Sequence, residues 1–137
     1  MSEKNERLGI KLNRESVIAL KELKKIFYGD SEIPISDGFL IGEAFKKIEP
    51  VVNQIDWELL NDKKTSVPGI TDNKDPQFES MRTTLAIDKT VFQKMKMLQE
   101  NLIKETRGRV FFSFVVKSVL FAAILQHNND LENFIKK

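Results

Sequence analysis

The hydrophobic pattern of this chain changes period twice, and each change separates a short strand from a helix. In residues 82–87 apolar and polar side chains alternate, and from Asp88 onward the apolar residues follow helical spacing. Residues 7–12 alternate in the same way, and Asn13 stands where that pattern ends. Alternation is typical of a strand with one buried face, whereas spacings of three and four are typical of an amphipathic helix. The pattern therefore predicts strands at 7–12 and 82–87, each followed directly by a helix.

These two passages belong to an internal repeat, because shifting the chain by 75 residues superimposes them. Self-similarity at a fixed offset indicates two copies of one structural unit. An isolated two-stranded ribbon is only marginally stable in water, so we expect the two strands to pair antiparallel over a shared core. The residues expected to face that core are Leu8, Ile10, Leu12, Leu85 and Ile87. The pairs that coincide with this offset are Ile10/Leu85, Leu12/Ile87, Asn13/Asp88, Val17/Phe92, Leu20/Met95, Leu23/Leu98 and Phe27/Leu102.

Capping residues set the expected limits of four helices. Asn13 and Asp88 have side-chain oxygens that can accept a hydrogen bond from an amide in the first turn, as Ser36 and Ser113 do for the second helix of each copy. Gly29 and Gly108 stand where a helix end can take a left-handed conformation. The helices are therefore predicted at 14–28, 37–48, 89–106 and 114–126.

The chain accordingly divides into a first unit at 1–48, a connecting segment at 49–80, a second unit at 81–126 and a tail at 127–137. Within the connecting segment, residues 51–60 have the spacing of a short amphipathic helix that Trp57 would hold against the body. Residues 61–77 are rich in turn-forming Pro, Gly, Asn and Asp, which predicts a loop. The tail either adds a helical turn or frays.

Composition narrows the classes of function. The chain has 137 residues, enough for one modest domain or two small units that share a core, and it has no cysteine, which excludes disulfides and cysteine-based zinc sites. Its N-terminal MSEKNER is not expected to act as a signal peptide, and no stretch is apolar enough for a membrane span. The net charge is only +2, but residues 81–137 carry ten basic and five acidic groups, whereas residues 49–80 carry three and seven. This distribution is compatible with a polyanion that touches only part of the chain.

The order of strand, capped helix, turn and second helix resembles the ribbon-helix-helix family of DNA-binding proteins. IKLNRESVIALKELKKIF is similar to the strand-to-helix passage of Arc-type repressors, and RTTLAIDKTVFQKMKML is more typical still. The resemblance covers nearly two thirds of the chain, and two copies in one chain are similar to the tandem arrangement of a plasmid transfer protein. It implies a mainly α fold in which two ribbon-helix-helix units form an intramolecular pseudo-dimer, with a two-stranded antiparallel ribbon over four helices.

The resemblance also implies a mode of DNA binding. A two-stranded ribbon can enter the major groove, where arginine pairs with guanine. By position, the side chains directed at bases are those of Arg7, Gly9, Lys11, Arg82, Thr84 and Ala86. Gly9 and Ala86 have little with which to reach a base, so base contact is expected to rest on the other four. Phosphate contact is expected at the start of the second helices and in the loop before the last of them, at Ser36, Arg107, Arg109 and Ser113.

Each of these residues also has a structural interpretation. The three strand cations are also compatible with ordinary solvated positions, and Thr84 with strand propensity alone. Ser36 and Ser113 are explained by capping alone, and Arg107 and Arg109 complement a nearby helix C-terminus.

The sequence contains no phosphate-binding glycine loop, metal-ligand cluster or nucleophile motif, and its single histidine, His127, has no partner at a catalytic spacing. We therefore expect no enzyme activity and no cofactor or metal. The predicted function is sequence-specific binding of double-stranded DNA in a prokaryotic cytoplasm, on nucleoid or plasmid DNA. Transcriptional repression and an accessory role at a plasmid transfer origin both fit, with side-by-side self-association on DNA. The alternative is a protein-interaction module, antitoxin-like or an assembly scaffold, that binds a protein partner through residues 49–80 or the tail.

Overall fold

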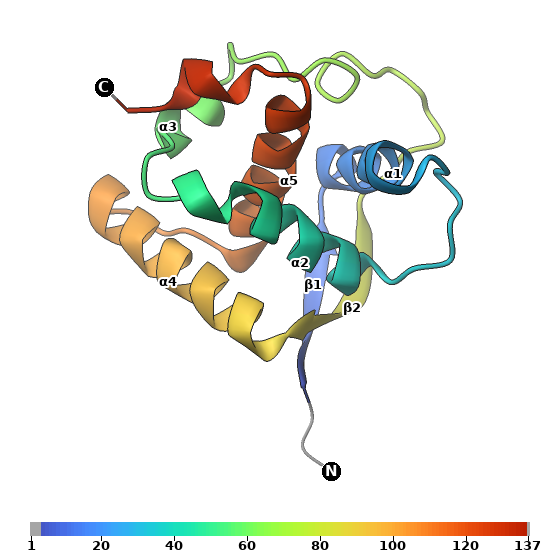
Figure 1. The fold of residues 1–137 in the computed structure, drawn as a ribbon, viewed down its shortest axis with the longest axis horizontal. Coiled ribbons are helices and arrows are strands. Elements are labelled where there is room, and N and C mark those ends of the chain that lie inside the picture. Colours follow the sequence, from blue (N-terminus) through green and yellow to red (C-terminus); the bar gives the residue numbers. More distant parts are fainter. Residues whose placement is uncertain (1–3, 137) are drawn as a thin grey trace.

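The computed structural model describes residues 4–136 and places the two alternating segments side by side in one antiparallel ribbon (Figure 1). Strand β1 spans Asn5–Leu12 and strand β2 spans Met81–Asp88. At the centre of the ladder Gly9 lies opposite Thr84. Thr84 is also the residue that corresponds to Gly9 when the chain is shifted by 75 residues. The predicted pairing of the two strands is confirmed, and both strands are slightly longer than alternation alone indicated.

Each strand runs directly into a helix because a capping side chain starts the helix there. Helix α1 spans Arg14–Tyr28 and helix α4 spans Lys89–Thr106, as predicted. The side-chain oxygen of Asn13 accepts a hydrogen bond from the amide of Ser16 at 2.8 Å, and Asp88 does the same for the first amides of α4. These bonds satisfy amides that the first turn of a helix leaves without a partner. The period changes in the sequence therefore mark true helix starts.

The second helices of the two halves begin differently. Helix α2 spans Asp37–Ile48, and the hydroxyl of Ser36 caps it by accepting a hydrogen bond from the amide of Phe39 at 3.2 Å. That cap was predicted and is confirmed. The last helix also follows a loop from its preceding helix, but no side chain caps it.

The predicted cap of the last helix, Ser113, is wrong. Helix α5 spans Phe112–His127, so it starts earlier than expected and Ser113 lies inside its first turn. Phe111 occupies the N-cap position and makes no side-chain capping bond. The physical reason is aromatic packing, because the ring of Phe112 lies 5.3 Å from that of Phe92 and fixes the start of the helix against α4.

The two first helices also end differently. Gly29 closes α1 in the left-handed conformation with φ 75°, as its position predicted, and its amide donates to the carbonyl of Lys25 at 2.8 Å. At the end of α4 it is Arg107, not Gly108, that takes the left-handed conformation, with φ 56°. The expected cap at Gly108 is therefore displaced by one residue. Left-handed backbone is costly for an arginine, and the bond from its amide to the carbonyl of Ile103 offsets part of that cost.

The segment between the halves folds onto the body. A short 3₁₀ turn at Glu49–Val51 precedes helix α3, which spans Trp57–Leu60, so the helix predicted at 51–60 is present only in its last turn. The side chain of Asp56 caps α3, and the Trp57 indole donates to the carbonyl of Val52 at 3.3 Å. An aspartate at this position stops a continuous helix, because its side chain bonds to the amides after it.

The fold class predicted from the sequence, two ribbon-helix-helix units with a ribbon over four helices, is wrong. Within residues 4–136 the chain forms a single two-stranded sheet and five helices. Each half contributes one strand, so neither half builds a ribbon of its own. The fifth helix is α3, which Trp57 and Leu60 bury against the body, so the joining segment is part of the fold.

The core lies between the ribbon and the helices, and α5 crosses its centre. Most of α5 from Val115 to Leu125 is buried, which explains why this segment has apolar residues around its whole circumference. The inner face of the ribbon supplies Leu12, Leu85 and Ile87, all fully buried, while the predicted core residues Leu8 and Ile10 are partly buried.

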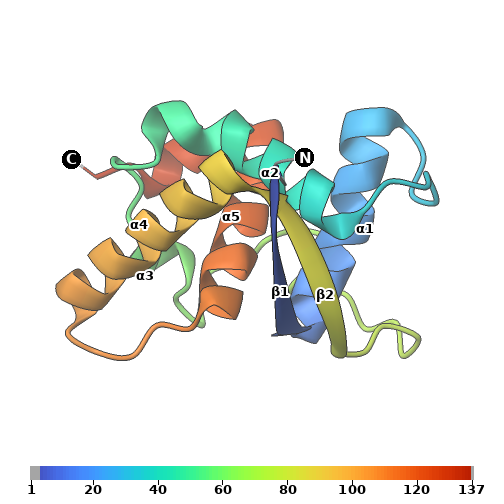
Figure 2. The same cartoon turned by 90° about the horizontal axis from the view of Figure 1, so that it is seen from below.

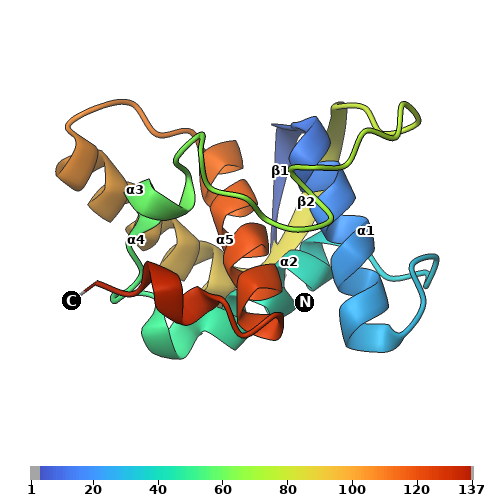
Figure 3. The same ribbon diagram turned by 90° about the horizontal axis from the view of Figure 1, so that it is seen from above.

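The long loop and the tail close two sides of the molecule (Figure 3). Loop 61–80 passes over α1, where the guanidinium of Arg14 donates to the carbonyl of Asp75 at 3.0 Å. Its turn-forming side chains hold this path, and the amide of Gln77 lowers the pKa of the Asp75 carboxyl by donating to it. The tail ends in a 3₁₀ turn at Leu131–Phe134 and lies beside α3.

Candidate nucleic-acid interface

One face of the β1–β2 ribbon points away from the helices (Figure 2). This outer face carries the polar residues of both strands. Exposure alternates along each strand, so every second side chain lies on this outer face. Five of the six residues predicted to contact bases are exposed there, and the sixth, Ala86, is half-buried. The exposed outer-face residues are Asn5, Arg7, Gly9, Lys11, Arg82, Thr84 and Asp88.

Two of the basic residues on this face lie directly opposite each other. The ladder pairs Lys11 with Arg82, and it pairs Arg7 with Ala86. Among the described residues, no ion pair includes Arg7, Lys11 or Arg82. Like charges placed directly opposite on a ribbon repel each other and destabilise it. A local conflict of this kind on an exposed face is typical of a functional surface, here one suited to anions.

A groove of about 220 Å³ continues from the Lys11 end of the ribbon to the start of α5. Lys11, Asn13, Ser113, Phe114 and Lys117 line it. The Lys117 ammonium lies over the Phe114 ring, 5.2 Å from its centroid, which holds it at the groove. The first amides of a helix carry partial positive charge, and together with two lysines they suit a phosphate. The structure thus places Ser113 beside the ribbon, though not as a cap.

The corresponding groove at the other side of the ribbon carries both signs of charge. It measures about 400 Å³ and runs from the start of α2, where Ser36 stands, to the end of β2. Its lining includes the carboxylates of Asp88 and Glu43 as well as the ammonium groups of Lys4 and Lys46. Carboxylates repel phosphate, so this side suits a DNA backbone less well than the α5 side.

Helix α2 approaches β2 so closely that only glycine fits at the contact. A Cβ added to Gly38 would lie 2.1 Å from the carbonyl oxygen of Ala86. This close approach explains why Ala86 is half-buried, and only its methyl group is left for a base. Ala86 is therefore the predicted contact that has the least access to a ligand.

The two loop arginines lie apart from the ribbon. Arg107 follows the last turn of α4, and an 18-residue helix is on the order of 27 Å long, so this residue is about one helix length from the end of β2. Arg109 is exposed, with its guanidinium 5.9 Å from the centroid of the Phe111 ring. The loop that holds both returns from the far end of α4 to the start of α5 (Figure 2). Only the end of this loop that joins α5 therefore reaches the interface.

Two further residues belong to this surface that the sequence pattern did not single out. Asn5 lies on the outer face opposite Asp88, because β1 begins two residues before the alternation of apolar side chains does. Lys117 lines the basic groove one helical turn after Ser113. The sequence pattern gives no sign that Asn5 belongs to a strand, because its neighbours are polar. Lys117 could have been found from the sequence, because a helical projection places it one turn after Ser113.

Comparisons of the chain with protein-family models, curated proteins and solved structures found no match. Among the helices formed by residues 4–136, none has both the length and the apolar character needed to cross a bilayer.

Proposed function

We propose that this protein binds double-stranded DNA by inserting the outer face of the β1–β2 ribbon into the major groove. The observation that carries the proposal is the pairing of Lys11 with Arg82 on the outer face of the ribbon, which also carries Arg7 and Thr84. The major groove is wide enough for a two-stranded ribbon, and its guanine edges accept hydrogen bonds from arginine and lysine. The resemblance of the sequence to ribbon-helix-helix DNA-binding proteins is a second, weaker support.

Base contact would be unequal along the ribbon. Lys11 and Arg82 lie together at one end, so this end would favour adjacent guanines. Toward the other end Arg7 is the single cation of its pair, and Asn5 can form a bidentate pair with adenine. Gly9 lies at the centre without a side chain and leaves that position to Thr84. The expected target is therefore not palindromic.

Phosphate contacts would fix the ribbon in the groove. The basic groove at the start of α5 would take one phosphate through the amides around Ser113 and through Lys117. Ser36 would contribute a weaker contact, because Asp88 and Glu43 share its groove. Arg107 and Arg109 would act only on DNA that extends beyond the groove occupied by the ribbon. Such binding could serve transcriptional regulation or an accessory role at a plasmid transfer origin in a prokaryotic cytoplasm.

The test is a selection from a random duplex library, followed by fluorescence anisotropy on the selected duplex across a salt series. We expect affinity to fall steeply with salt, because phosphate contacts release counterions. Arg82→Ala should weaken binding by about 1–3 kcal/mol and relax the preference at one base pair. The matched control is Lys63→Ala, which removes one positive charge from the exposed part of loop 61–80 and should change little.

Two results would contradict the proposal. The first is a library from which no duplex is enriched and to which the protein does not bind at low salt, as expected if the chain is a protein-interaction module. The second is equal loss of affinity in the Arg82→Ala and Lys63→Ala variants, which would show non-specific attraction in place of ribbon contact.

A further inference from the structure

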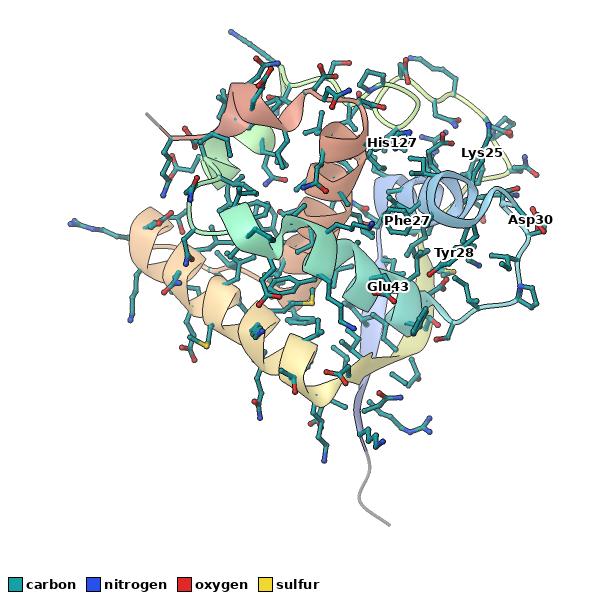
Figure 4. The ribbon with its side chains drawn as sticks, viewed as in Figure 1. Lys25, Phe27, Tyr28, Asp30, Glu43 and His127 are labelled. Atoms are coloured by element: carbon teal, nitrogen blue, oxygen red, sulfur yellow. The ribbon has the colours of Figure 1, made fainter. Side chains whose placement is uncertain are left out.

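A cavity lies far from the ribbon's outer face, where α1, α2 and α5 meet. It has a volume of about 500 Å³ and is open to solvent on one side. Phe27 and Tyr28 form an aromatic wall from the end of α1, while Glu43, Lys47 and His127 bring polar groups from the other two helices. Figure 4 shows Phe27, Tyr28, Glu43 and His127 around the place where these helices come together.

The corresponding surface of the second half is covered by the chain itself. The end of α4 is the counterpart of the end of α1, and there Ile55 and Trp57 lie against Leu98 and Leu102. Both covering side chains are buried, and the cavity left at this place measures only about 30 Å³. With the repeat offset, Leu102 corresponds to Phe27, so the two surfaces occupy equivalent positions.

The cover is a turn that leads into helix α3, and backbone hydrogen bonds hold it to the C-terminal tail. Ile55 and Ile135 form an isolated antiparallel bridge, and the amide of Asp56 donates to the carbonyl of Phe134 at 2.6 Å. The amide of Lys136 in turn donates to the carbonyl of Gln54 at 2.7 Å. A turn with large apolar side chains is therefore what this kind of surface takes where it is filled.

The charges around the open cavity favour an acidic occupant. The ammonium of Lys47 lies 5.7 Å from the centroid of the Phe27 ring and makes no ion pair with a described residue. Glu43, the carboxylate of the lining, pairs with Lys46 at 3.9 Å, so its negative charge is partly compensated. The segment that covers the counterpart surface, residues 52–57, has one acidic residue, Asp56, and no basic one.

We propose that this cavity is a docking site for an acidic peptide segment of a partner protein that carries an aromatic anchor. The anchor would lie against Phe27 and Tyr28, as Trp57 lies against the end of α4. An acidic side chain of the peptide would pair with Lys47, which then exchanges solvent for a carboxylate. The proposal does not depend on DNA binding, because the cavity shares no residue with the outer face of the ribbon.

The probe is a synthetic peptide of sequence VVNQIDWELL, which copies residues 51–60, titrated into the isotopically labelled full chain and followed by amide NMR. We expect saturable shifts confined to the ends of α1 and α5 and to the second half of α2. Lys47→Glu should weaken binding roughly fivefold, the loss of one partly exposed ion pair. Lys104→Glu, the same change on the exposed end of α4, should leave the affinity unchanged, and the spectra report directly whether each variant is folded.

Three outcomes would overturn the proposal. One is the absence of saturable shifts at millimolar peptide, and another is shifts centred on α4 and residues 51–57, which would mean that the peptide displaces the chain's own segment. The third outcome comes from a titration with indole-3-propionate, a small aromatic acid without a peptide backbone. If it causes the same shifts at a lower concentration than the peptide, the cavity is a small-molecule site. Loss of binding by peptide with tryptophan replaced by alanine supports the anchor role.

Discussion

The two halves of this protein share one order of elements, yet they treat the shared ribbon differently. In the first half α2 packs tightly on β2, and its groove contains carboxylates. In the second half α5 starts without a cap and leaves a groove with two lysines beside β1. The ends of α1 and α4 differ as well, since one borders an open cavity and the other is covered by the chain's own segment. The comparison shows that a repeated backbone pattern sets where sites can form, while a few side chains decide which copy uses them.

The largest expected effect concerns the close packing of α2. Gly38→Ala would place a methyl group into the backbone of Ala86, and neither backbone can move without disturbing the ribbon. We expect the free energy of unfolding to fall by about 1–3 kcal/mol or more. Urea denaturation followed by circular dichroism measures this change.

Gly42→Ala is the matched control for Gly38→Ala, because it lies in the same helix and a Cβ there meets no atom within 4 Å. Alanine is a better helix former than glycine, so this variant should be more stable by about 0.5–1 kcal/mol. If both variants had the same stability, the close approach of α2 to β2 would be wrong.

The next effect separates the two serines that the sequence placed in equivalent roles. Ser36→Ala removes the hydrogen bond to the amide of Phe39 and should cost about 0.5–2 kcal/mol. Ser113→Ala removes no capping bond, because Ser113 lies inside the first turn of α5, so stability should change by less than about 0.5 kcal/mol. Thermal unfolding of the two variants in parallel checks the difference. Equal losses would show that Ser113 caps α5 after all.

Much of the backbone was predictable because it depends on local signals. The presence of both strands, the limits of α1, α2 and α4, and the caps at Asn13, Ser36 and Asp88 all follow from periodicity and from side chains that bond to nearby amides. The failures have non-local causes. The start of α5 depends on the packing of Phe112 against Phe92, and the fifth helix depends on burial of Trp57 and Leu60 by distant segments.

The candidate site was predictable only as far as the ribbon determines it. Alternation identifies the outer-face residues, but the repeat offset is compatible with more than one register, so the pairing of Gly9 with Thr84 comes from the structure. The opposition of Lys11 and Arg82 follows from that pairing. The groove next to Lys117 and the cavity next to Lys47 could not be found, because each forms where helices from different parts of the chain meet.

The smallest expected effect tests whether the two opposed cations, Lys11 and Arg82, lower the stability of the folded protein. Lys11→Thr removes the repulsion with Arg82 and should raise the free energy of unfolding by about 0.2–1 kcal/mol at low salt. Salt screens exposed charges, so the gain should shrink as ionic strength rises. The same variant should bind duplex DNA less tightly, because it loses a cation from the proposed contact face.

Threonine also has a high strand propensity, so Lys11→Thr needs a control that changes propensity without relieving repulsion. Arg7→Thr serves, because Arg7 lies opposite the uncharged Ala86. A gain in stability that both variants share comes from the strand propensity of threonine. Only the additional gain in Lys11→Thr, measured across a salt series, reports the repulsion between Lys11 and Arg82. An equal and salt-independent gain in both variants would mean that Lys11 and Arg82 do not repel each other in the folded protein. The basic end of the ribbon would then carry no cost in stability, and its support for a binding role would be lost.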